Sequence, residues 1–514
     1  TPPTGTDPNL NYFYDRSSNL TQIQTGSAAT ATYTYSPVNM ATSVTDQDGG
    51  KTTFQYGDPR DTLRTETDYP NNVAMKIGYD SSDRIKDTTV TGPNSPTPLV
   101  HYTYCYKDNG CSGADTALLQ QQSDKVANLT TNYTYSKVSR LQGATTTNSS
   151  GATTDTYHYN YDPVGNIISK LVGSSTTDYA YNEDNELYCS YPDSTSGCGA
   201  SSATSYGYDG AGGLTSINAP GTSSDYSFAY DAKQQTTSIT PPGSSQVSLS
   251  YQDANQVRLI TEGSLRYGYN LLGQSSVAPN SGTANTTTFA RDNMGTLVEE
   301  RVAQSGSSAV HYYYLFDSLG SVIGLTNDSG NLVGGTTYRY EPYGKMTEDP
   351  TQGTSVSNPW GFAAGLNDSQ TGFYKFGDRF YNPDAMRWTQ MDPVGGHLSN
   401  PMTLHRYLYA QDLPNVITDP NGRDTTYCFL TPENYASCQE SQTLAQIEAE
   451  PFNWEQLEEG VLGCIGGGLV GAEYGEYVPI AGEATPLAGA LAGCLVGGTS
   501  EAITGVNILD PTSP

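Results

Sequence analysis

The stretch Tyr-Asn-Tyr-Asp-Pro-Val-Gly-Asn-Ile at residues 159–167 decides the fold. Tyr159 and Tyr161 stand at positions i and i+2, which places both rings on one face of a β-strand. Asp162 and Gly165 then favour a tight turn, because an aspartate bonds its own backbone and glycine adopts a positive φ without steric cost. A second alternating segment begins at Ile167. The stretch therefore predicts one β-hairpin.

The same unit recurs along the chain with a period near 22 residues and occasional insertions. An isolated hairpin cannot bury its own apolar face, so neighbouring units must add side by side. The sequence predicts a mainly β fold, in which a spiral antiparallel β-strip curls into a shell or solenoid. The second aromatic of the unit marks the series at Tyr14, Tyr35, Tyr56, Tyr79, Tyr104, Tyr135, Tyr161, Tyr181, Tyr208, Tyr230, Tyr251 and Tyr269.

Composition narrows the function. The 514 residues hold 24 Lys and Arg against 53 Asp and Glu, which gives a net charge of −29. This acidity excludes the simplest nucleic-acid-binding function, since phosphate contacts need clustered cations. The 40 Tyr and 54 Gly are typical of a turn-rich β protein. Exposed tyrosine faces could also stack on sugars, so a carbohydrate partner is a third, weaker hypothesis.

The eight cysteines indicate disulfides more than metal binding, because their spacings do not make two linked Cys-x-x-Cys knuckles. Disulfides imply an oxidising, extracellular setting, and we expect no metal and no cofactor. The N-terminus has no basic segment before an apolar run, so a signal peptide is absent or removed, or the sequence is a fragment. The expected pairs are Cys105 with Cys111, Cys189 with Cys198, Cys428 with Cys438, and, less securely, Cys464 with Cys494.

The repeat series resembles the RHS or YD-repeat proteins. A second, ordered set of motifs resembles the RHS-associated core of that family. The resemblance implies a hollow shell of repeats, a core domain that plugs one end, and a variable C-terminal segment inside. It divides the chain into repeats at 1–309, a core at 310–422 and a tail at 423–514. The core motifs include Tyr-Glu-Pro-Tyr-Gly at 340–344, Arg-Phe-Tyr-Asn-Pro at 379–383, Arg-Trp at 387–388, and Asp-Pro-x-Gly at both 392–395 and 419–422.

The resemblance also implies a possible reaction, because several members cut off their own C-terminal segment with a pair of aspartates. The matching positions are Asp392 and Asp419, with Asp412 as a further carboxylate between them. Two carboxylates that share a proton can activate water. This chain departs from the pattern, since Met391 replaces the usual arginine. The alternative, which we favour on the sequence, is that both Asp-Pro-x-Gly motifs simply form tight turns.

The tail contains no recognisable enzyme, since residues 423–514 hold one cation, Arg423, and no histidine. Its glycines recur every fourth residue, which favours close helix packing. We expect two helices near 455–476 and 485–504 that reverse around Pro479. They would serve either as a packed plug or as a membrane-contacting element. The glycines of the two faces are Gly463, Gly467, Gly471 and Gly475, then Gly489, Gly493 and Gly497.

Two functions remain open on the sequence. The first is an extracellular structural or interaction protein, a shell or fibre subunit that encloses or docks its glycine-rich tail and assembles with itself or with cell-surface partners. The second is a polymorphic-toxin carrier that releases a membrane-acting effector by self-cleavage at the aspartates. Both place the protein outside a bacterial cell or on its surface.

Overall fold

A computed structural model describes residues 10–423, apart from gaps at 58–62, 195–196, 222–224, 253–256, 281–285, 304–305, 369, 395 and 397–400. The chain divides into Thr1–Ala449 and Glu450–Pro514, and every described residue belongs to the first unit. The predicted helical hairpin, its seven glycines, and the pairs Cys428–Cys438 and Cys464–Cys494 lie outside the described residues.

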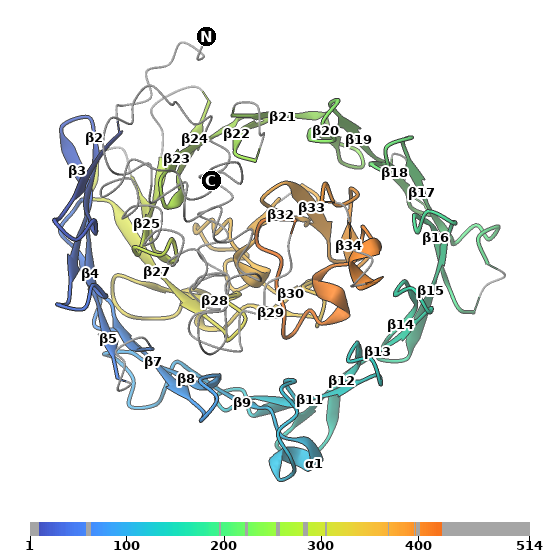
Figure 1. Cartoon of the computed structure of the whole chain (residues 1–514), viewed down its shortest axis with the longest axis horizontal. Helices are drawn as coiled ribbons and strands as arrows, with labels where there is room; N and C mark the ends of the chain where they lie inside the picture. The colour runs from blue at the N-terminus through green and yellow to red at the C-terminus, as the bar shows by residue number, and fades with distance from the viewer. Residues whose placement is uncertain are drawn as a thin grey trace, which may run out of the picture. The chain divides into compact units, whose positions relative to one another are not determined.

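Most of the described chain is one antiparallel sheet of 28 strands, in which each strand pairs with its neighbours in sequence (Figure 1). This confirms the predicted mainly β strip of hairpins. The strands are β1 Leu10–Tyr14, β2 Leu20–Thr25, β3 Ala28–Tyr35, β4 Ala41–Asp46, β5 Lys51–Tyr56, β6 Arg64–Asp68, β7 Ala74–Tyr79, β8 Ile85–Thr91, β9 Val100–Cys105, β10 Gln121–Asp124, β11 Leu129–Tyr135, β12 Leu141–Asn148, β13 Thr153–Tyr161, β14 Ile167–Val172, β15 Ser175–Tyr181, β16 Leu187–Pro192, β17 Thr204–Tyr208, β18 Leu214–Asn218, β19 Tyr226–Tyr230, β20 Thr236–Thr240, β21 Val247–Tyr251, β22 Leu259–Glu262, β23 Leu265–Asn270, β24 Gly273–Pro279, β25 Thr287–Arg291, β26 Leu297–Val302, β27 Val310–Phe316 and β28 Val322–Asn327.

Each hairpin turns at an aspartate or a similar polar residue that bonds its own backbone. In the unit at 159–167, the N–H groups of Val164 and Asn166 donate to Asp162 Oδ1 at 3.0 and 2.8 Å. Gly165 has a φ of 110°, a conformation that costs glycine little. The strand pairing shifts register just before the turn, between Asn160 and Tyr161, and most other hairpins shift at the same place. The turn chemistry expected from the sequence is therefore present.

In many units the second tyrosine ties its hairpin to the preceding one. Its hydroxyl donates to the carbonyl of the first residue of the previous return strand, so the contact links adjacent units only. We call this set of bonds the tyrosine ladder. Its bonds include Tyr35 to Leu20 at 2.7 Å, Tyr56 to Ala41 at 2.9 Å, Tyr79 to Arg64 at 2.8 Å, Tyr181 to Ile167 at 2.8 Å, Tyr230 to Leu214 at 2.7 Å and Tyr251 to Thr236 at 2.8 Å.

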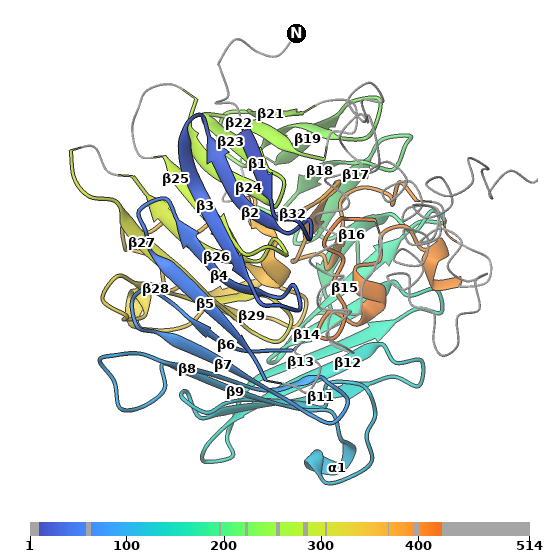
Figure 2. The same cartoon turned by 60° about the vertical axis from the view of Figure 1, so that its left-hand side comes forward.

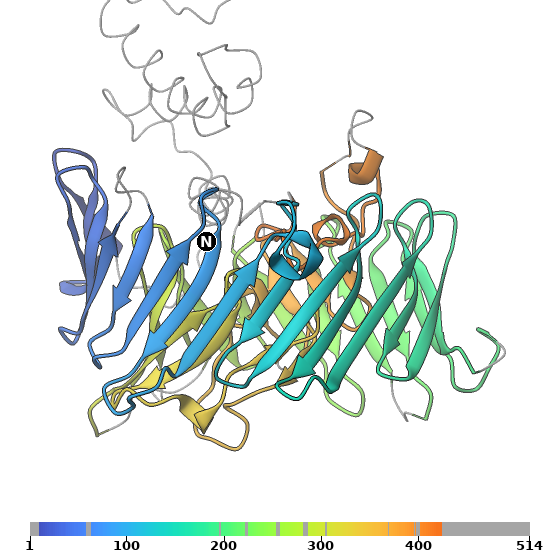
Figure 3. The same ribbon diagram turned by 90° about the horizontal axis from the view of Figure 1, so that it is seen from below.

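The strip curls through more than one full turn, as Figures 1 and 2 show from two sides. Strands β25–β28 come back to lie against the early strands β3–β9, while the strands keep a common tilt along the strip (Figure 3). Hydrogen bonds join the two turns of the spiral. They include the Tyr33 hydroxyl to the Arg291 carbonyl at 3.0 Å, the Tyr69 hydroxyl to the Tyr314 carbonyl at 2.6 Å, and the Ser318 N–H to the Tyr104 hydroxyl at 3.1 Å.

The core follows the strip and lies within its curve (Figure 1). The sheet continues to Asn327, so the expected boundary at 309/310 falls between β26 and β27 of the same sheet. The centre of the core is aromatic: Tyr381, Trp388 and Tyr409 are fully buried. The core elements are the 3₁₀ turns η1 Val333–Gly335, η2 Phe362–Ala364, η3 Pro401–Leu404 and η4 Ala410–Asp412, and the strands β29 Arg339–Tyr340, β30 Met346–Glu348, β31 Leu366–Asn367, β32 Tyr374–Phe376, β33 Arg379–Asn382 and β34 Arg387–Trp388.

Polar bonds hold the core against the strip. The Tyr407 hydroxyl donates to the Gly212 carbonyl at 2.9 Å. The Lys170 ammonium on β14 forms an ion pair of 2.6 Å with Glu341, and both side chains are only 8% exposed. The core is thus fixed to the inner face of the strip by buried partners as well as by apolar contact.

Two of the expected disulfides fall within the described residues. Cys105 is bonded to Cys111, next to the short helix α1 Asp108–Cys111, and Cys189 is bonded to Cys198. Each closes a loop within one hairpin connection. Within the described part of the chain, no helix is both long and apolar enough to cross a membrane.

Glu300 on β26 is a fully buried carboxyl. Its Oε2 accepts the Tyr314 hydroxyl at 2.8 Å, and its Oε1 has no hydrogen-bond partner among the described residues. Burial raises the pKa of Glu300 from 4.5 to about 7. The folded protein therefore keeps a proton that the unfolded chain releases above pH 4.5. The stability from this group is complete below pH 4.5 and is lost as the pH rises through about 7.

Glu300→Gln is expected to raise the melting temperature at pH 8 and to leave it nearly unchanged at pH 5. The reason is that a shift of about 2.5 pKa units corresponds to about 3 kcal/mol of penalty on the ionised carboxylate, which glutamine does not carry. Thermal melts of both proteins from pH 5 to pH 8 measure the difference. Comparing the two proteins isolates Glu300 from other buried groups. One of these is His405: burial lowers its pKa to about 3, so its contribution to stability increases with pH instead of decreasing. An offset that stays constant with pH would contradict the prediction.

Candidate functional site

Two of the three expected aspartates meet at one arginine. Arg379 Nη2 on β33 lies 2.8 Å from Asp392 Oδ2 and 3.0 Å from Asp419 Oδ2. The Arg379 guanidinium lies over the Trp388 ring at 4.1 Å, and its Nη1 donates to the Arg406 carbonyl at 3.2 Å. We call Asp392, Arg379 and Asp419 the carboxylate pair site. A guanidinium lies between the two carboxylates where the sequence analysis expected a shared proton.

The carboxylate pair is built from the two Asp-Pro-x-Gly turns. At the first, the Val394 N–H donates to Asp392 Oδ1 at 2.8 Å. At the second, Gly422 has a φ of 69°, and a Cβ there would lie 2.6 Å from the Phe376 carbonyl, so only glycine fits. The second motif is therefore a tight turn, and the described part of the first is a bend at residues 393–394 that Asp392 caps. Both aspartates face Arg379. The two interpretations of these motifs, as turns and as a carboxylate site, are therefore compatible.

Asp419 also contacts the start of the tail. Its Oδ1 accepts the backbone N–H of Arg423 at 3.0 Å, while its Oδ2 faces Arg379. The Arg423 guanidinium forms an ion pair with Asp378. The peptide bond that joins the core to the tail is thus held against the carboxylate pair. Asp419 is almost fully buried, with 2% of its side chain exposed, whereas 18% of the Asp392 side chain is exposed.

Asp412 lies elsewhere and has a different partner. Its Oδ2 is 3.4 Å from Arg140 Nε on the strip, and the side chain is 2% exposed. Burial raises the pKa of Asp412 well above its usual range. Three successive residues, Ala410, Gln411 and Asp412, have φ between 49° and 62°, an uncommon conformation for residues other than glycine. Asp412 therefore joins the core to the strip and is not among the groups around Arg379.

The family model described as the Teneurin YD-shell matches residues 274–415, which span the last strands of the strip and most of the core. The chain is an RHS/YD-repeat protein.

Relatives of this YD-repeat protein include the tRNA3(Ser)-specific nuclease WapA of Bacillus spizizenii, which is 26% identical over 22% of the chain and 5% of its own length. Salivary gland surface protein 1 of Aedes aegypti is 31% identical over 22% of the chain and 3% of its own length. The solved structure of TcdB2-TccC3-TEV has a TM-score of 0.36 at 14% identity, over 80% of this chain and 26% of that one. The chain thus covers only a small part of the curated relatives it matches.

Sequence reasoning on the YD-repeat chain found the two aspartates but not the residue that joins them. Arg379 stood in one of the quoted core motifs and Trp388 in another, yet neither was assigned to the site. The residue types were a clue, because an arginine guanidinium often stacks on a tryptophan ring. The spacing of these motifs along the chain does not reveal that residues 379, 392 and 419 meet in the fold.

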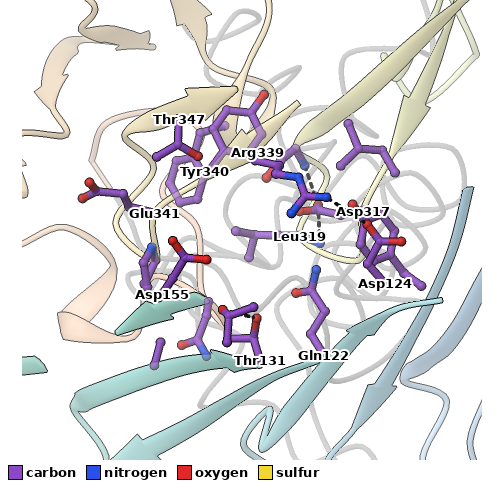
Figure 4. A pocket seen from close by; sticks show the side chains of 18 of the residues that line it. Gln122, Asp124, Thr131, Asp155, Asp317, Leu319, Arg339, Tyr340, Glu341 and Thr347 are labelled. Atoms are coloured by element: carbon purple, nitrogen blue, oxygen red, sulfur yellow. Dashed lines mark hydrogen bonds and ion pairs between the residues drawn. The ribbon is translucent and has the colours of Figure 1, made fainter. Parts of the chain in front are cut away.

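A cavity of about 390 Å³ lies between the YD-repeat strip and the core (Figure 4). Gln122, Thr131 and Asp155 from the strip face Asp317 and Arg339 across it. Arg339 is held by Asp124 at 3.7 Å and by Glu348 at 3.0 Å. Burial raises the pKa of Asp317 to about 6. The lining is acidic, and it does not include Asp392 or Asp419, so the carboxylate pair site is separate from this cavity.

Proposed function

We propose that this YD-repeat protein is an extracellular carrier shell whose core cuts the junction to its own C-terminal segment. The observation that supports this is the contact of Asp419 with the Arg423 amide while Arg379 holds Asp419 beside Asp392. A carboxylate pair placed at the one peptide that leads into the tail has the position that self-cleavage needs.

The proposed reaction is hydrolysis of the peptide bond between Gly422 and Arg423. Asp392, the more exposed carboxylate, takes a proton from a water molecule, whose oxygen adds to the Gly422 carbonyl carbon. The carbon–nitrogen bond then breaks as the proton held by Asp392 passes to the departing Arg423 nitrogen, while Asp419 Oδ1 keeps that nitrogen in place through its N–H. Arg379 offsets the charge of both carboxylates through the steps. The products are a carboxylate at Gly422 and a free amine at Arg423.

Asp392→Asn and Asp419→Asn are each expected to abolish the cut. Intact-mass measurement of purified protein would find the unchanged chain split at 422/423 and both variants whole. Asp349→Asn is the matched control: Asp349 also precedes a proline and accepts the Thr351 N–H at 2.8 Å, but it is exposed and away from Arg379. That control should cut like the unchanged protein.

An uncut unchanged chain would reject self-cleavage and favour the other role, a structural shell that keeps its tail docked. Equal loss of cutting in the Asp349 control would show a general folding effect instead of chemistry at the carboxylate pair. In either role the tail is the segment to be delivered or docked, and the membrane-acting character suggested by its glycine spacing remains part of this proposal.

A further inference from the structure

A histidine and two carboxylates meet where the two turns of the spiral touch. Asp46 ends β4 on the first turn, Glu299 lies on β26, and His311 lies on β27 of the second turn. One ligand atom from each lies within 4.8 Å of the other two. His311 Nδ1 contacts Glu299 Oε1 and is 4.0 Å from Asp46 Oδ2.

The cluster is largely buried, and one of its oxygens accepts no hydrogen bond within the described part of the chain. The side chains of Asp46 and Glu299 are 5% and 3% exposed. Asp46 Oδ1 accepts the N–H groups of Asp48 and Gly50 at 2.7 and 2.9 Å, as a turn aspartate does. Asp46 Oδ2 has no hydrogen-bond partner among the described residues and faces the imidazole. A buried acceptor left in this state is costly unless something positive fills the gap.

The carboxylates around His311 favour a bound cation, and the imidazole favours a metal ion that accepts nitrogen ligands. The backbone N–H of His311 donates to Asp328 at 3.2 Å, so Asp46, Asp48, Glu299 and Asp328 all lie near the imidazole, and Arg301 pairs with Asp48. His311 Nε2 lies 3.5 Å from Asp48 Oδ2. A metal-bound histidine commonly donates its other ring N–H to a carboxylate, and Asp48 is the carboxylate nearest Nε2. Burial also raises the pKa of Glu299 to about 7, and the neighbouring Asp46 adds to the shift.

We propose that Asp46, Glu299 and His311 bind a divalent transition-metal ion of the Zn²⁺ class, which joins the two turns of the spiral. Zinc accepts imidazole nitrogen and carboxylate oxygen in one site, and three protein ligands leave its fourth position for water. Ligand atoms around tetrahedral zinc lie about 3.3 Å apart, so the short Nδ1–Oε1 contact opens and the 4.0 Å separation closes by small side-chain rotations.

The test uses the full chain, first stripped with a chelator and then titrated with ZnCl₂ by calorimetry and by thermal melting. We expect one zinc site that raises the melting temperature, and at least a tenfold loss of affinity in Glu299→Gln and in His311→Gln. Ca²⁺ is expected to bind far more weakly, because it takes oxygen ligands. His101→Gln is the matched control: His101 also pairs with a carboxylate, Asp87 at 2.9 Å, but belongs to no such cluster among the described residues, and should leave zinc binding unchanged.

Three outcomes would overturn the proposal. Absence of zinc binding would mean that a proton shared between Asp46 and Glu299 fills the gap. Zinc binding that survives Glu299→Gln and His311→Gln would place the ion elsewhere, for example on the tail. Equal binding of Ca²⁺ would reject the ion class. Asp46→Asn provides a second variant if one of the others fails to fold, as judged by circular dichroism.

Discussion

Lys170→Met is expected to lower the free energy of unfolding by about 3–5 kcal/mol, because it leaves the Glu341 carboxylate buried without its cation. The pair joins the strip to the core, with 2.6 Å between the charged atoms and 8% of each side chain exposed. Methionine keeps the length of the side chain, so the loss comes from the missing charge. Urea unfolding followed by circular dichroism measures it.

The double variant Lys170→Met with Glu341→Gln should recover much of this loss, since no unpaired charge remains. Lys76→Met is the surface control: Lys76 pairs with Glu66 at 3.3 Å, but 57% of its side chain is exposed. An exposed pair contributes about 0–1 kcal/mol, so this variant should unfold almost like the unchanged protein. If Lys170→Met were as mild as Lys76→Met, the core would not depend on this ion pair.

Trp388→Ala is expected to lower the free energy of unfolding by about 3–5 kcal/mol and to slow the proposed self-cleavage as well. The indole is fully buried, with ring centroids 5.8 Å from Tyr381 and 5.6 Å from Tyr409. Its removal leaves a cavity at the centre of the core. It also removes the surface on which the Arg379 guanidinium lies at 4.1 Å, so the two carboxylates lose their common partner.

Trp388→Phe separates the two effects, because a smaller aromatic ring keeps a platform for Arg379 while leaving some empty volume. It should restore cutting more fully than it restores stability. Denaturant unfolding and intact mass over time give the two readouts. Unchanged cutting in a destabilised Trp388→Ala protein would show that Arg379 is positioned without the indole.

The strip was predictable from the sequence because its determinants are local. Alternating aromatics followed by a turn aspartate and glycine, as at 159–167, specify one hairpin, and the period of the units specifies how hairpins add. The short disulfide loops are local for the same reason. The carboxylate pair was reached only through family resemblance, because the approach of 379, 392 and 419 depends on how the core closes.

The cluster of Asp46, Glu299 and His311 could not be predicted from the sequence for a related reason, and the sequence analysis expected no metal. Asp46 looks like one more turn aspartate, and Glu299 and His311 look like ordinary strand residues. Their meeting depends on how many hairpins complete one turn of the spiral, and twist accumulates over many strands. Small local differences in twist, which no single repeat reveals, decide which strands face each other.

The tyrosine ladder and the contacts between the two turns respond differently to the insertion or deletion of a repeat. A change of one whole repeat can preserve the ladder bonds, because each of these bonds joins a tyrosine to the unit just before it. The same change shifts every later strand against the first turn, so Tyr33 no longer meets Arg291 and Asp46 no longer meets His311. The number of repeats between the strands that meet across the two turns should therefore be held constant.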